Sequence, residues 1–426
     1  MLEHSTAKAS LVQSIKDSRP LLISATQGLV QAASQNPPGD VSAAAETAIA
    51  LIRQHIPSSI ISVHETTPGV TNVVAVLQSN QPGKTLVFSG HLDTYPTGEA
   101  SQWNFPPLGG TVSDDGTRLY GRGAADMKGG IAASIIAMRA LAEQKSAWDG
   151  QVALALAGDE ETMGNLGTAW LLENVNVVKT ADAVIVGDAG SPLIIRTGEK
   201  GLLWLELTCT GKAAHGAHVH RGSNAIEALL EAIRRIKQLE EWPVPADEVS
   251  QTIEAAKAIS EPLSGEGEAQ VLNKITVNVG TISGGTSMNL VPDYASARLD
   301  IRLPNGVATA QLVEHVDATL ASVESLGGVS YRVIQKYDPT WTSPSEDIVK
   351  CALHAAREIV SPKAIVNMRV GASDARLYRA KGIPTVVVGL TPFNMGGADE
   401  YCIVDELEQV AKVHGLAAME FLKSKG

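Results

Sequence analysis

The 426-residue sequence has few cysteines, few aromatic residues and no long uncharged apolar run. Its three cysteines, Cys209, Cys351 and Cys402, lie far apart and form no CxxC pair, so neither a disulfide framework nor a thiolate metal site is expected. No segment approaches the roughly 18 apolar residues that a membrane-spanning helix needs, and charges are spread through the N-terminal segment. We therefore expect a cytoplasmic protein with no export signal and no membrane anchor.

Basic residues are in the minority, with 34 Lys and Arg against 46 Asp and Glu and a formal net charge of −12. This balance disfavours nucleic acid or an anionic membrane as the main partner and favours a small-molecule substrate. The 44% of hydrophobic residues suffices for a buried core, and the length suggests two or three domains.

Short apolar runs alternate with helical patterns along the chain. The pattern from Leu11 to Ile56 is helical, with Asp40 as a candidate N-cap. The expected buried strands are Thr85–Gly90, Gln151–Gly158, Ala183–Gly187 and Pro384–Gly389, with a helix over Ile131–Gln144. This predicts an α/β catalytic domain with a mixed sheet flanked by helices, whose ligands gather beyond the carboxyl ends of the strands.

Residues 201–338 have a different pattern. Strands over 202–211, 274–283, 294–303 and 329–338 and helices over 223–241 and 307–325 follow the βαββαβ order of a ferredoxin-like unit. This predicts an inserted lid or dimerisation domain and leaves the catalytic domain in two sequence halves, 1–200 and 339–426. The acidic segment Glu241–Asn273, with several prolines and glycines, is expected to be an excursion on the surface of the inserted domain.

Two candidate ligand motifs precede the helix predicted over Ile131–Gln144. In SGHLDTYP, His91 and Asp93 lie two apart after a strand and point to the same side, where a carboxylate commonly holds a ligand histidine. In LYGRGAADMKGG, Asp126 lies in a glycine-rich turn that allows close approach to an ion or substrate. Each motif taken singly also fits a structural role, such as helix capping by Asp126.

Two further acidic motifs end apolar strands. AGDEETMG places Asp159, Glu160 and Glu161 together, where three carboxylates repel one another unless a cation neutralises them. The alternative is a solvated acidic turn, and Asp188 in VIVGDAG taken singly could be an ordinary loop aspartate. Together the four motifs supply an imidazole and several carboxylates, a ligand set suited to one or two Zn²⁺, Mn²⁺ or Co²⁺ ions.

These motifs resemble those of the M20 family of metallopeptidases and deacylases, which includes acetylornithine deacetylase, succinyl-diaminopimelate desuccinylase, aminoacylase and glutamate carboxypeptidase. The likeness covers nearly the whole chain: GHLDTYP matches the first metal motif, GRGAADMKGG the bridging-aspartate motif, and DEET the base-plus-ligand pair. The resemblance implies metal-dependent hydrolysis of an amide bond in an N-acyl amino acid or a small peptide. Zn²⁺ is the expected ion, with Co²⁺ or Mn²⁺ as alternatives.

The resemblance also assigns roles to individual residues. His91, Asp126 and Asp188 would hold one metal, and Asp126, as a bridge, would hold a second together with Glu161. Two other residues have supporting roles: Asp93 would orient His91, and Glu160 would be the general base. That base would take a proton from the metal-activated water and later hand it to the leaving amine.

The inserted domain contributes to the site in this family. GKAAHGAHVHRGSNAI resembles the segment whose histidine reaches the active site of a neighbouring subunit, which implies a homodimer through the inserted domain. His215 matches that histidine and would stabilise the oxyanion of the tetrahedral intermediate. His218 and His220 are close, and Val219 stands where the family has a proline, so the assignment among the three histidines stays open.

Two other segments resemble the parts of the family that grip a substrate carboxylate. GGTSMNLVPDYASARLDIR suggests Asn289 and Arg302 as contacts, and VGASDARLY suggests the Gly371 backbone and Arg376. An alternative for Arg302 is a structural ion pair.

The chain departs from the family at its last metal motif. The family has a histidine four or five residues before a glutamate, whereas TPFNMGGADEYC has Gly396 and Met395 before Glu400. The ligand that replaces this histidine stays open: Asn394, Asp399, Cys402 or a water could fill the place, or the protein could use a single ion.

The altered motif leaves two alternatives to hydrolysis. One is a different reaction on an amide or related bond, such as amide formation or group transfer, and the other is a non-catalytic binding module. The intact Glu160 argues against the binding module, because such a module has no need of a general base beside its carboxylates.

Overall fold

The computed structural model describes residues 2–321 and 328–423, and the chain divides into two compact units. Unit 1 comprises residues 1–197, 342–367 and 373–426, and unit 2 comprises residues 198–341 and 368–372. Each unit is described by itself. Among the described residues, we find no helix that is both long enough and apolar enough to span a membrane.

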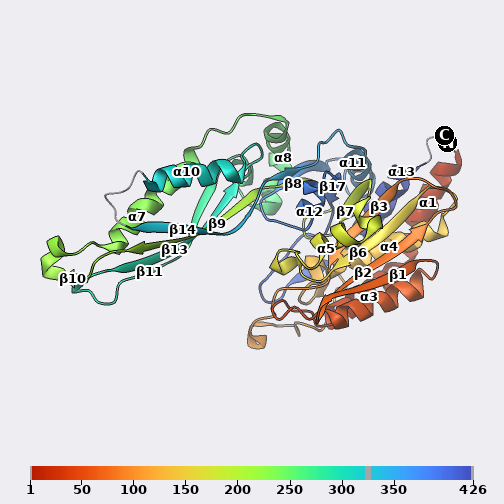
Figure 1. Cartoon of the computed structure of the whole chain (residues 1–426). Helices are drawn as coiled ribbons and strands as arrows, with labels where there is room; N and C mark the ends of the chain where they lie inside the picture. The colour runs from red at the N-terminus through yellow and green to blue at the C-terminus, as the bar shows by residue number, and fades with distance from the viewer. Residues whose placement is uncertain (1, 322–327, 424–426) are drawn as a thin grey trace. The chain divides into compact units, whose positions relative to one another are not determined.

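Unit 1 is built on strands and helices from both sequence halves (Figure 1). Its principal strands, including two that run on into unit 2, are β1 (Ile60–Thr67), β2 (Val70–Gln78), β3 (Thr85–His91), β4 (Thr111–Val112), β5 (Arg118–Tyr120), β6 (Gln151–Ala157), β7 (Ala183–Val186), β8 (Ile194–Glu199), β16 (Ile365–Arg369), β17 (Thr385–Val387) and β18 (Tyr401–Ile403). Its helices are α1 (Leu2–Asp17), α2 (Arg19–Gln31), α3 (Ser42–His55), α4 (Gly129–Glu143), α5 (Thr168–Asn174), α6 (Asn176–Lys179), α11 (Asp347–Ile359), α12 (Ala375–Ala380) and α13 (Val404–Phe421). Short helical turns are η1 (Ala100–Gln102), η2 (Ala124–Lys128) and η3 (Glu160–Thr162).

The large sheet is mixed and has helices on both faces, which confirms the predicted fold class of this part. Its order is β1-β2-β6-β3-β7-β17-β8, with β6, β3, β7 and β17 parallel and the outer neighbours antiparallel. Alternate residues of β3 pack into different hydrophobic clusters. Leu86 and Phe88 pack with α4 and α13, whereas Val87 packs with α5 and α12. The central strands are therefore buried on both sides, as their continuous apolar runs indicate.

The N-terminal helical pattern forms three helices, α1, α2 and α3. α2 begins at Arg19 with a proline in its first turn, and the chain between Gln31 and Ser42 is not helical. Asp40 does act at the start of α3, because its carboxylate accepts a hydrogen bond from the Ser42 N–H at 3.0 Å.

Unit 2 contains the four-stranded sheet of a ferredoxin-like unit. Its elements are β9 (Gly201–Thr210), β10 (Ala214–His215), η4 (Gly216–Arg221), α7 (Ala225–Ile236), η5 (Lys237–Glu241), α8 (Glu248–Ser264), α9 (Glu268–Leu272), β11 (Thr276–Gly284), β12 (Leu290–Val291), β13 (Tyr294–Leu303), α10 (Thr309–Ala321), β14 (Val329–Tyr337) and β15 (Thr340–Trp341). The sheet order is β11-β13-β9-β14 and every pair is antiparallel, so the main elements follow βαββαβ. Residues 322–325 of the predicted helix lie outside the described residues.

The acidic segment Glu241–Asn273, which was predicted as a surface excursion, is mainly helical. α8 begins with a capping box in which the Asp247 carboxylate accepts from the Ser250 N–H and the Ser250 hydroxyl accepts from the Asp247 N–H. Val249, Ile253 and Ala256 form its buried face.

A buried histidine lies in the core of unit 1. His414 of α13 contacts the Val388 carbonyl through Nε2 at 2.7 Å and the Ser134 hydroxyl through Nδ1 at 3.2 Å, and its ring stacks on Phe88. Burial lowers the pKa of His414 to about 4. The imidazole is therefore neutral in the folded protein at neutral pH, and it serves packing rather than metal binding.

We predict that protonation of His414 contributes to acid unfolding. The unfolded chain takes up this proton below about pH 6.5 and the folded protein only near 4, so the free energy of unfolding falls as the pH drops through that window, by about 3 kcal/mol at most. Urea unfolding at a series of pH values measures this slope. His414→Gln should reduce the slope, and His354→Gln, at an exposed site, should not; equal slopes in both variants would contradict the prediction.

Candidate metal centre

Three neighbouring parallel strands bring the predicted ligands to one edge of the sheet. His91 is the last residue of β3, η3 with Glu160 and Glu161 follows β6, and Asp188 follows β7. The donor atoms of His91, Asp126 and Asp188 all lie within 4.8 Å of one another, and so do those of His91, Glu160 and Glu161. The predicted ligands therefore form one cluster.

The orientation of His91 is set by the backbone of Asp93. Nδ1 lies 2.9 Å from the Asp93 carbonyl oxygen and Nε2 lies 3.2 Å from Asp126 Oδ1. An Nδ1–H that donates to the carbonyl leaves the Nε2 lone pair available for a cation. The Asp93 carboxylate is 3.5 Å from Nδ1 and accepts instead from the N–H groups of Glu160 (3.1 Å) and Glu161 (3.0 Å). Asp93 thus links His91 to the turn that carries the two glutamates.

The turn that carries Asp126 depends on a close backbone approach. A Cβ on Gly130, at the start of α4, would lie 1.9 Å from the Gly187 carbonyl oxygen, so only glycine lets this turn lie beside the end of β7 and Asp188. The glycine-rich motif thereby brings Asp126 and Asp188 together.

A buried ion pair between Arg122 and Glu400 supports the turn that carries Asp126. Glu400 accepts from the N–H groups of Ala125 (3.2 Å) and Asp126 (3.4 Å), and it pairs with Arg122 at 2.6 Å. Both side chains are about 1% exposed. Burial, reinforced by the nearby Asp126 carboxylate, raises the pKa of Glu400 to about 7 even with Arg122 beside it.

The electrostatics of the cluster fit a cation. Burial raises the pKa of Glu160 well above its ordinary value, and the carboxylates of Asp374, Asp188 and Glu161 add to the shift. Burial and the Asp126 carboxylate raise the pKa of Glu161 to about 8. Glu161 Oε1 is buried and has no hydrogen-bond partner among the described residues. A divalent ion would satisfy this oxygen and relieve the repulsion between the carboxylates.

Several supporting residues were not predicted. Asn36 donates to the Asp93 carboxylate at 2.9 Å, and no motif marks it in the sequence. Asp374 is buried near Glu160 and accepts from the Thr168 hydroxyl at 2.6 Å. It lies in the VGASDARLY segment, which was singled out for other residues.

Arg376 makes structural contacts next to the cluster. Its guanidinium is buried and donates to the carbonyl oxygens of Ser373 (2.8 Å) and Met163 (2.7 Å). Met163 directly follows η3, so Arg376 holds the turn of Glu160 and Glu161, and its contact with a substrate stays a prediction.

The other predicted residues belong to unit 2. His215 is exposed on β10, and its Nδ1 accepts from the Ala217 N–H at 3.1 Å. Asn289 is exposed and accepts from the Ser287 hydroxyl. Arg302 pairs with Asp300 of its own strand at 2.7 Å, and Gly371 lies in the segment 368–372. Their action at the metal cluster stays a prediction.

The three candidate replacements for the missing histidine are engaged elsewhere. Cys402 is fully buried in the core of unit 1. The Asp399 carboxylate accepts from the N–H groups of Asn104 (2.8 Å) and Phe105 (3.3 Å), and Asn394 donates to the Asp399 carbonyl at 3.2 Å. These contacts fix the loop before Glu400.

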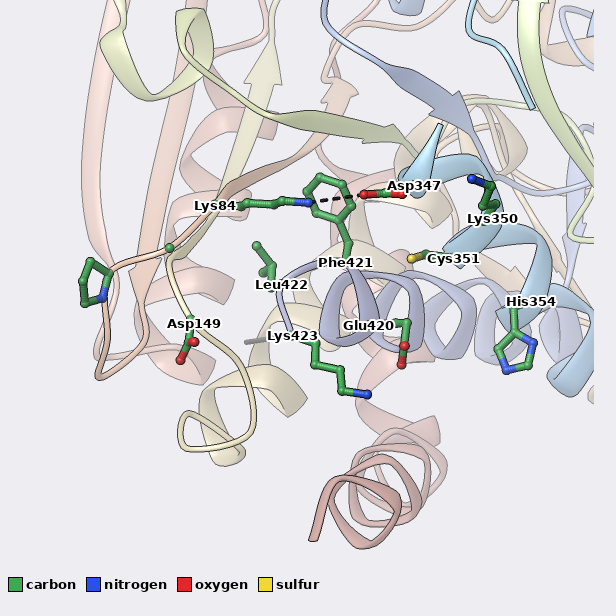
Figure 2. Close-up of a pocket in the computed structure, with 12 residues that line it drawn as sticks. Lys84, Asp149, Asp347, Lys350, Cys351, His354, Glu420, Phe421, Leu422 and Lys423 are labelled. Carbon is green, nitrogen blue, oxygen red and sulfur yellow. Dashed lines mark ion pairs between the residues drawn. The ribbon is translucent and has the colours of Figure 1, made fainter. Parts of the chain in front are cut away.

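A separate hollow of about 680 Å³ lies away from this cluster (Figure 2). Lys84, which lines it, precedes the first residue of β3, whereas His91 is the last, so the hollow and the cluster lie at opposite ends of this strand. Lys84 pairs with Asp347 at 3.5 Å beside the ring of Phe421. The hollow is therefore not part of the candidate metal centre.

Comparison with known proteins agrees with the geometry. Residues 87–420 match peptidase family M20/M25/M40. The chain is 30% identical over 357 residues to a succinyl-diaminopimelate desuccinylase of Parvibaculum lavamentivorans, with 82% of each chain covered.

Solved structures share the fold. An M20 family metallo-carboxypeptidase of Sulfolobus solfataricus superposes with a TM-score of 0.75 at 22% identity over 94% of this chain and 99% of that one. A dinuclear metal-binding peptidase of the M20 family from Bacillus subtilis gives a TM-score of 0.67 at 16% identity over 96% and 99%. The chain therefore belongs to peptidase family M20/M25/M40 and is a metal-dependent amide-bond hydrolase.

Proposed function

We propose that this protein hydrolyses the amide bond of a small N-acyl amino acid or peptide, with Zn²⁺ held by His91, Asp126 and Asp188. The observation that carries the proposal is the convergence of these three donors, within 4.8 Å, beside Glu160 and Glu161. One nitrogen and several carboxylate oxygens suit Zn²⁺ in a catalytic site. When bound, such an ion supplies Lewis acidity that activates a water and polarises the scissile carbonyl.

Glu160 is the proposed general base. Its side chain lies beside His91 and Glu161, its backbone is fixed by the Asp93 carboxylate, and its surroundings raise its pKa toward the range in which a carboxylate exchanges protons efficiently. Glu160 takes a proton from the attacking water and returns it to the nitrogen of the leaving amine. The cleaved bond is the carbonyl carbon to nitrogen bond, and the products are a carboxylic acid and an amine.

The relatives suggest that the substrate carries a carboxylate. Those compared by sequence are named as succinyl-diaminopimelate desuccinylases, and the solved structures include a carboxypeptidase and a tripeptidase. We assign the carboxylate to Asn289, Arg302 and the Gly371 backbone in unit 2. Arg302 would have to share its guanidinium with Asp300 to do this.

A substrate panel tests the proposal. The protein is incubated with N-succinyl, N-acetyl and dipeptide substrates, and release of the free amine is measured before and after chelation and again after Zn²⁺ is restored. We expect hydrolysis of at least one class, its loss on chelation and its return with Zn²⁺. Absence of hydrolysis throughout the panel in protein shown to hold Zn²⁺ would count against a hydrolase of this substrate class.

We also propose a homodimer formed through unit 2. β11 is an edge strand that pairs only with β13 among the described residues, and it carries the exposed Ile282. Met288, Leu290 and Tyr294 are exposed in the neighbouring segments. An unpaired edge with apolar side chains is a liability unless it is covered, and a second copy of the strand covers it symmetrically.

The dimer gives a prediction for His215. If His215 serves the partner's site, His215→Ala lowers turnover without lowering metal content. Mixing His215→Ala subunits with Glu160→Gln subunits should then restore part of the activity, because one hybrid site regains both groups. Turnover of the mixture after verified subunit exchange is the measurement, and no recovery would refute a shared site.

A further inference from the structure

The chain that links α2 to α3 contacts two of the ligand motifs through its backbone. The Ala32 carbonyl accepts from the ammonium group of Lys128, in the glycine-rich motif, at 2.6 Å. The N–H of Thr94, in the motif SGHLDTYP, donates to the Ser34 carbonyl at 2.9 Å, and the Thr94 carbonyl accepts from the Asn36 N–H at 2.8 Å. The link therefore lies against both motifs, although it carries none of the predicted ligands.

The side chain of Asn36 extends these contacts to a third motif. It is 8% exposed, and its Nδ2 donates to the Asp93 carboxylate at 2.9 Å and to the Thr162 hydroxyl at 3.2 Å. A side-chain amide nitrogen carries two N–H groups, so it can make both hydrogen bonds at once. Thr162 is the last residue of η3, which begins at Glu160. Asn36 therefore joins the motif of His91 to the turn that carries the two glutamates.

The Asp93 carboxylate completes the connection to the general base. It is fully buried and accepts from the N–H groups of Glu160 and Glu161, and the oxygen that faces Glu161 also accepts from the Asn36 amide. A donor atom of His91 and one of Glu160 lie within 4.8 Å of each other. A misplacement of about 1 Å at a catalytic group can cost about 10²-fold in rate, so the support of this turn matters for turnover.

We propose that Asn36 is a positioning residue for Glu160. Its amide joins Asp93 to Thr162, so both ends of η3 are fixed relative to His91: Asp93 holds the N–H groups at the start of the turn, and Asn36 holds the hydroxyl at its end. The effect on turnover rests on the proposed function, in which Glu160 is the general base. The effect on the turn itself needs no substrate and is measured separately.

Hydrogen exchange in the Zn²⁺-loaded protein tests the connection. Asn36→Ala should speed exchange of the backbone N–H groups of Glu160 and Glu161 by about twofold to tenfold, the scale of one net hydrogen bond. Gln151→Ala is the matched control, because the Gln151 amide donates to the Thr85 hydroxyl at 2.8 Å between the first residues of β6 and β3. It removes the same kind of bond from the same two strands at the ends away from the cluster, and should leave exchange in η3 unchanged.

Kinetics separate positioning from a merely structural role. Asn36→Ala should lower kcat by about tenfold or more, as is typical when an outer partner of a metal site is lost, while KM stays the same. Its Zn²⁺ content at saturation, measured by elemental analysis, should equal that of the unmodified protein. Gln151→Ala should leave both kcat and KM unchanged, even where urea unfolding shows that it is less stable.

Variants at Thr162, which is exposed, test the same connection even if Asn36→Ala does not fold. Thr162→Val removes the hydroxyl and should speed exchange in η3 and lower kcat by about twofold to tenfold, whereas Thr162→Ser keeps the hydroxyl and should change neither. In the double variant Asn36→Ala/Thr162→Val, the two losses of kcat should be less than multiplicative, because they break one shared contact. Unchanged exchange and kcat in Thr162→Val, or a fall in kcat that Gln151→Ala shares, would overturn the inference.

Failure of this inference and failure of the proposed function are distinguishable. If no substrate of the panel is hydrolysed, the proposed substrate class falls, and the exchange rates in η3 still decide whether Asn36 holds the turn. If a substrate is hydrolysed and Asn36→Ala alters neither exchange nor kcat, the role of Asn36 falls and the hydrolase remains.

Discussion

Glu160→Gln is expected to lower turnover by about 10²-fold or more, because an amide cannot take the proton of the attacking water. The substitution is nearly isosteric, and the backbone N–H of residue 160 keeps its hydrogen bond to Asp93. His91, Asp126 and Asp188 are untouched, so the first metal should stay. The measurement is the turnover number on the best substrate of the panel, together with elemental analysis of the purified variant.

Asp159 offers a matched control in the same turn. Its carboxylate accepts from the Leu166 N–H at 2.7 Å, and burial raises its pKa to about 6. It belongs to neither group of converging donors among the described residues. Asp159→Asn removes a neighbouring acid and should largely preserve turnover. A Glu160→Gln enzyme as active as Asp159→Asn would remove the base assignment.

The positions of the main ligands follow from local pattern. Each apolar run fixes where a strand ends, and His91, Glu160 and Asp188 come at or directly after such ends. Since β6, β3 and β7 are parallel neighbours, their carboxyl ends meet at one edge. The length and spacing of the apolar runs are therefore sufficient to predict that these ligands converge.

The supporting contacts could not be predicted in this way. Arg122 and Glu400 are 278 residues apart, and no periodicity links them. The sequence motif of Arg376 likewise gives no sign that its guanidinium holds the Met163 carbonyl. Such contacts depend on how two sequence halves pack, which single-residue patterns do not record.

The helix α8 was missed for another reason. The acidic composition of residues 241–273, with their prolines and glycines, indicated a surface excursion, yet Val249, Ile253 and Ala256 recur at helical spacing and form a buried face. The apolar periodicity and the capping residue Asp247 predict this helix better than composition does. Most of the stability of a helix in a protein comes from the burial of its apolar face.

Replacing Arg122 by methionine is expected to lower the free energy of unfolding by about 3–5 kcal/mol, the cost of breaking a buried ion pair on one side only. Glu400, whose pKa is about 7 even beside Arg122, would lose the charge that favours its ionised form, so at about 1% exposure it would have to take up a proton or stay charged without compensation. The Gly396 carbonyl would also lose its donor. Because Glu400 also holds the Asp126 N–H, affinity for the first ion should fall by roughly tenfold or more. Urea unfolding and metal titration measure the two effects.

The double variant Arg122→Met/Glu400→Gln distinguishes the effect of losing the opposite charge from the effect of losing the packing of the Arg122 side chain. The glutamine oxygen can still accept from the Ala125 and Asp126 N–H groups, but no charge is left buried. The double variant should therefore be more stable than the sum of the two single losses predicts, by roughly 1 kcal/mol or more for residues in direct contact. Simple additivity would mean that the Arg122 guanidinium acts through packing against Trp103, 5.3 Å from its ring, and not by neutralising Glu400. In that case the position of Asp126 would not depend on the charge of the pair, and metal affinity should be the same in Arg122→Met and the double variant.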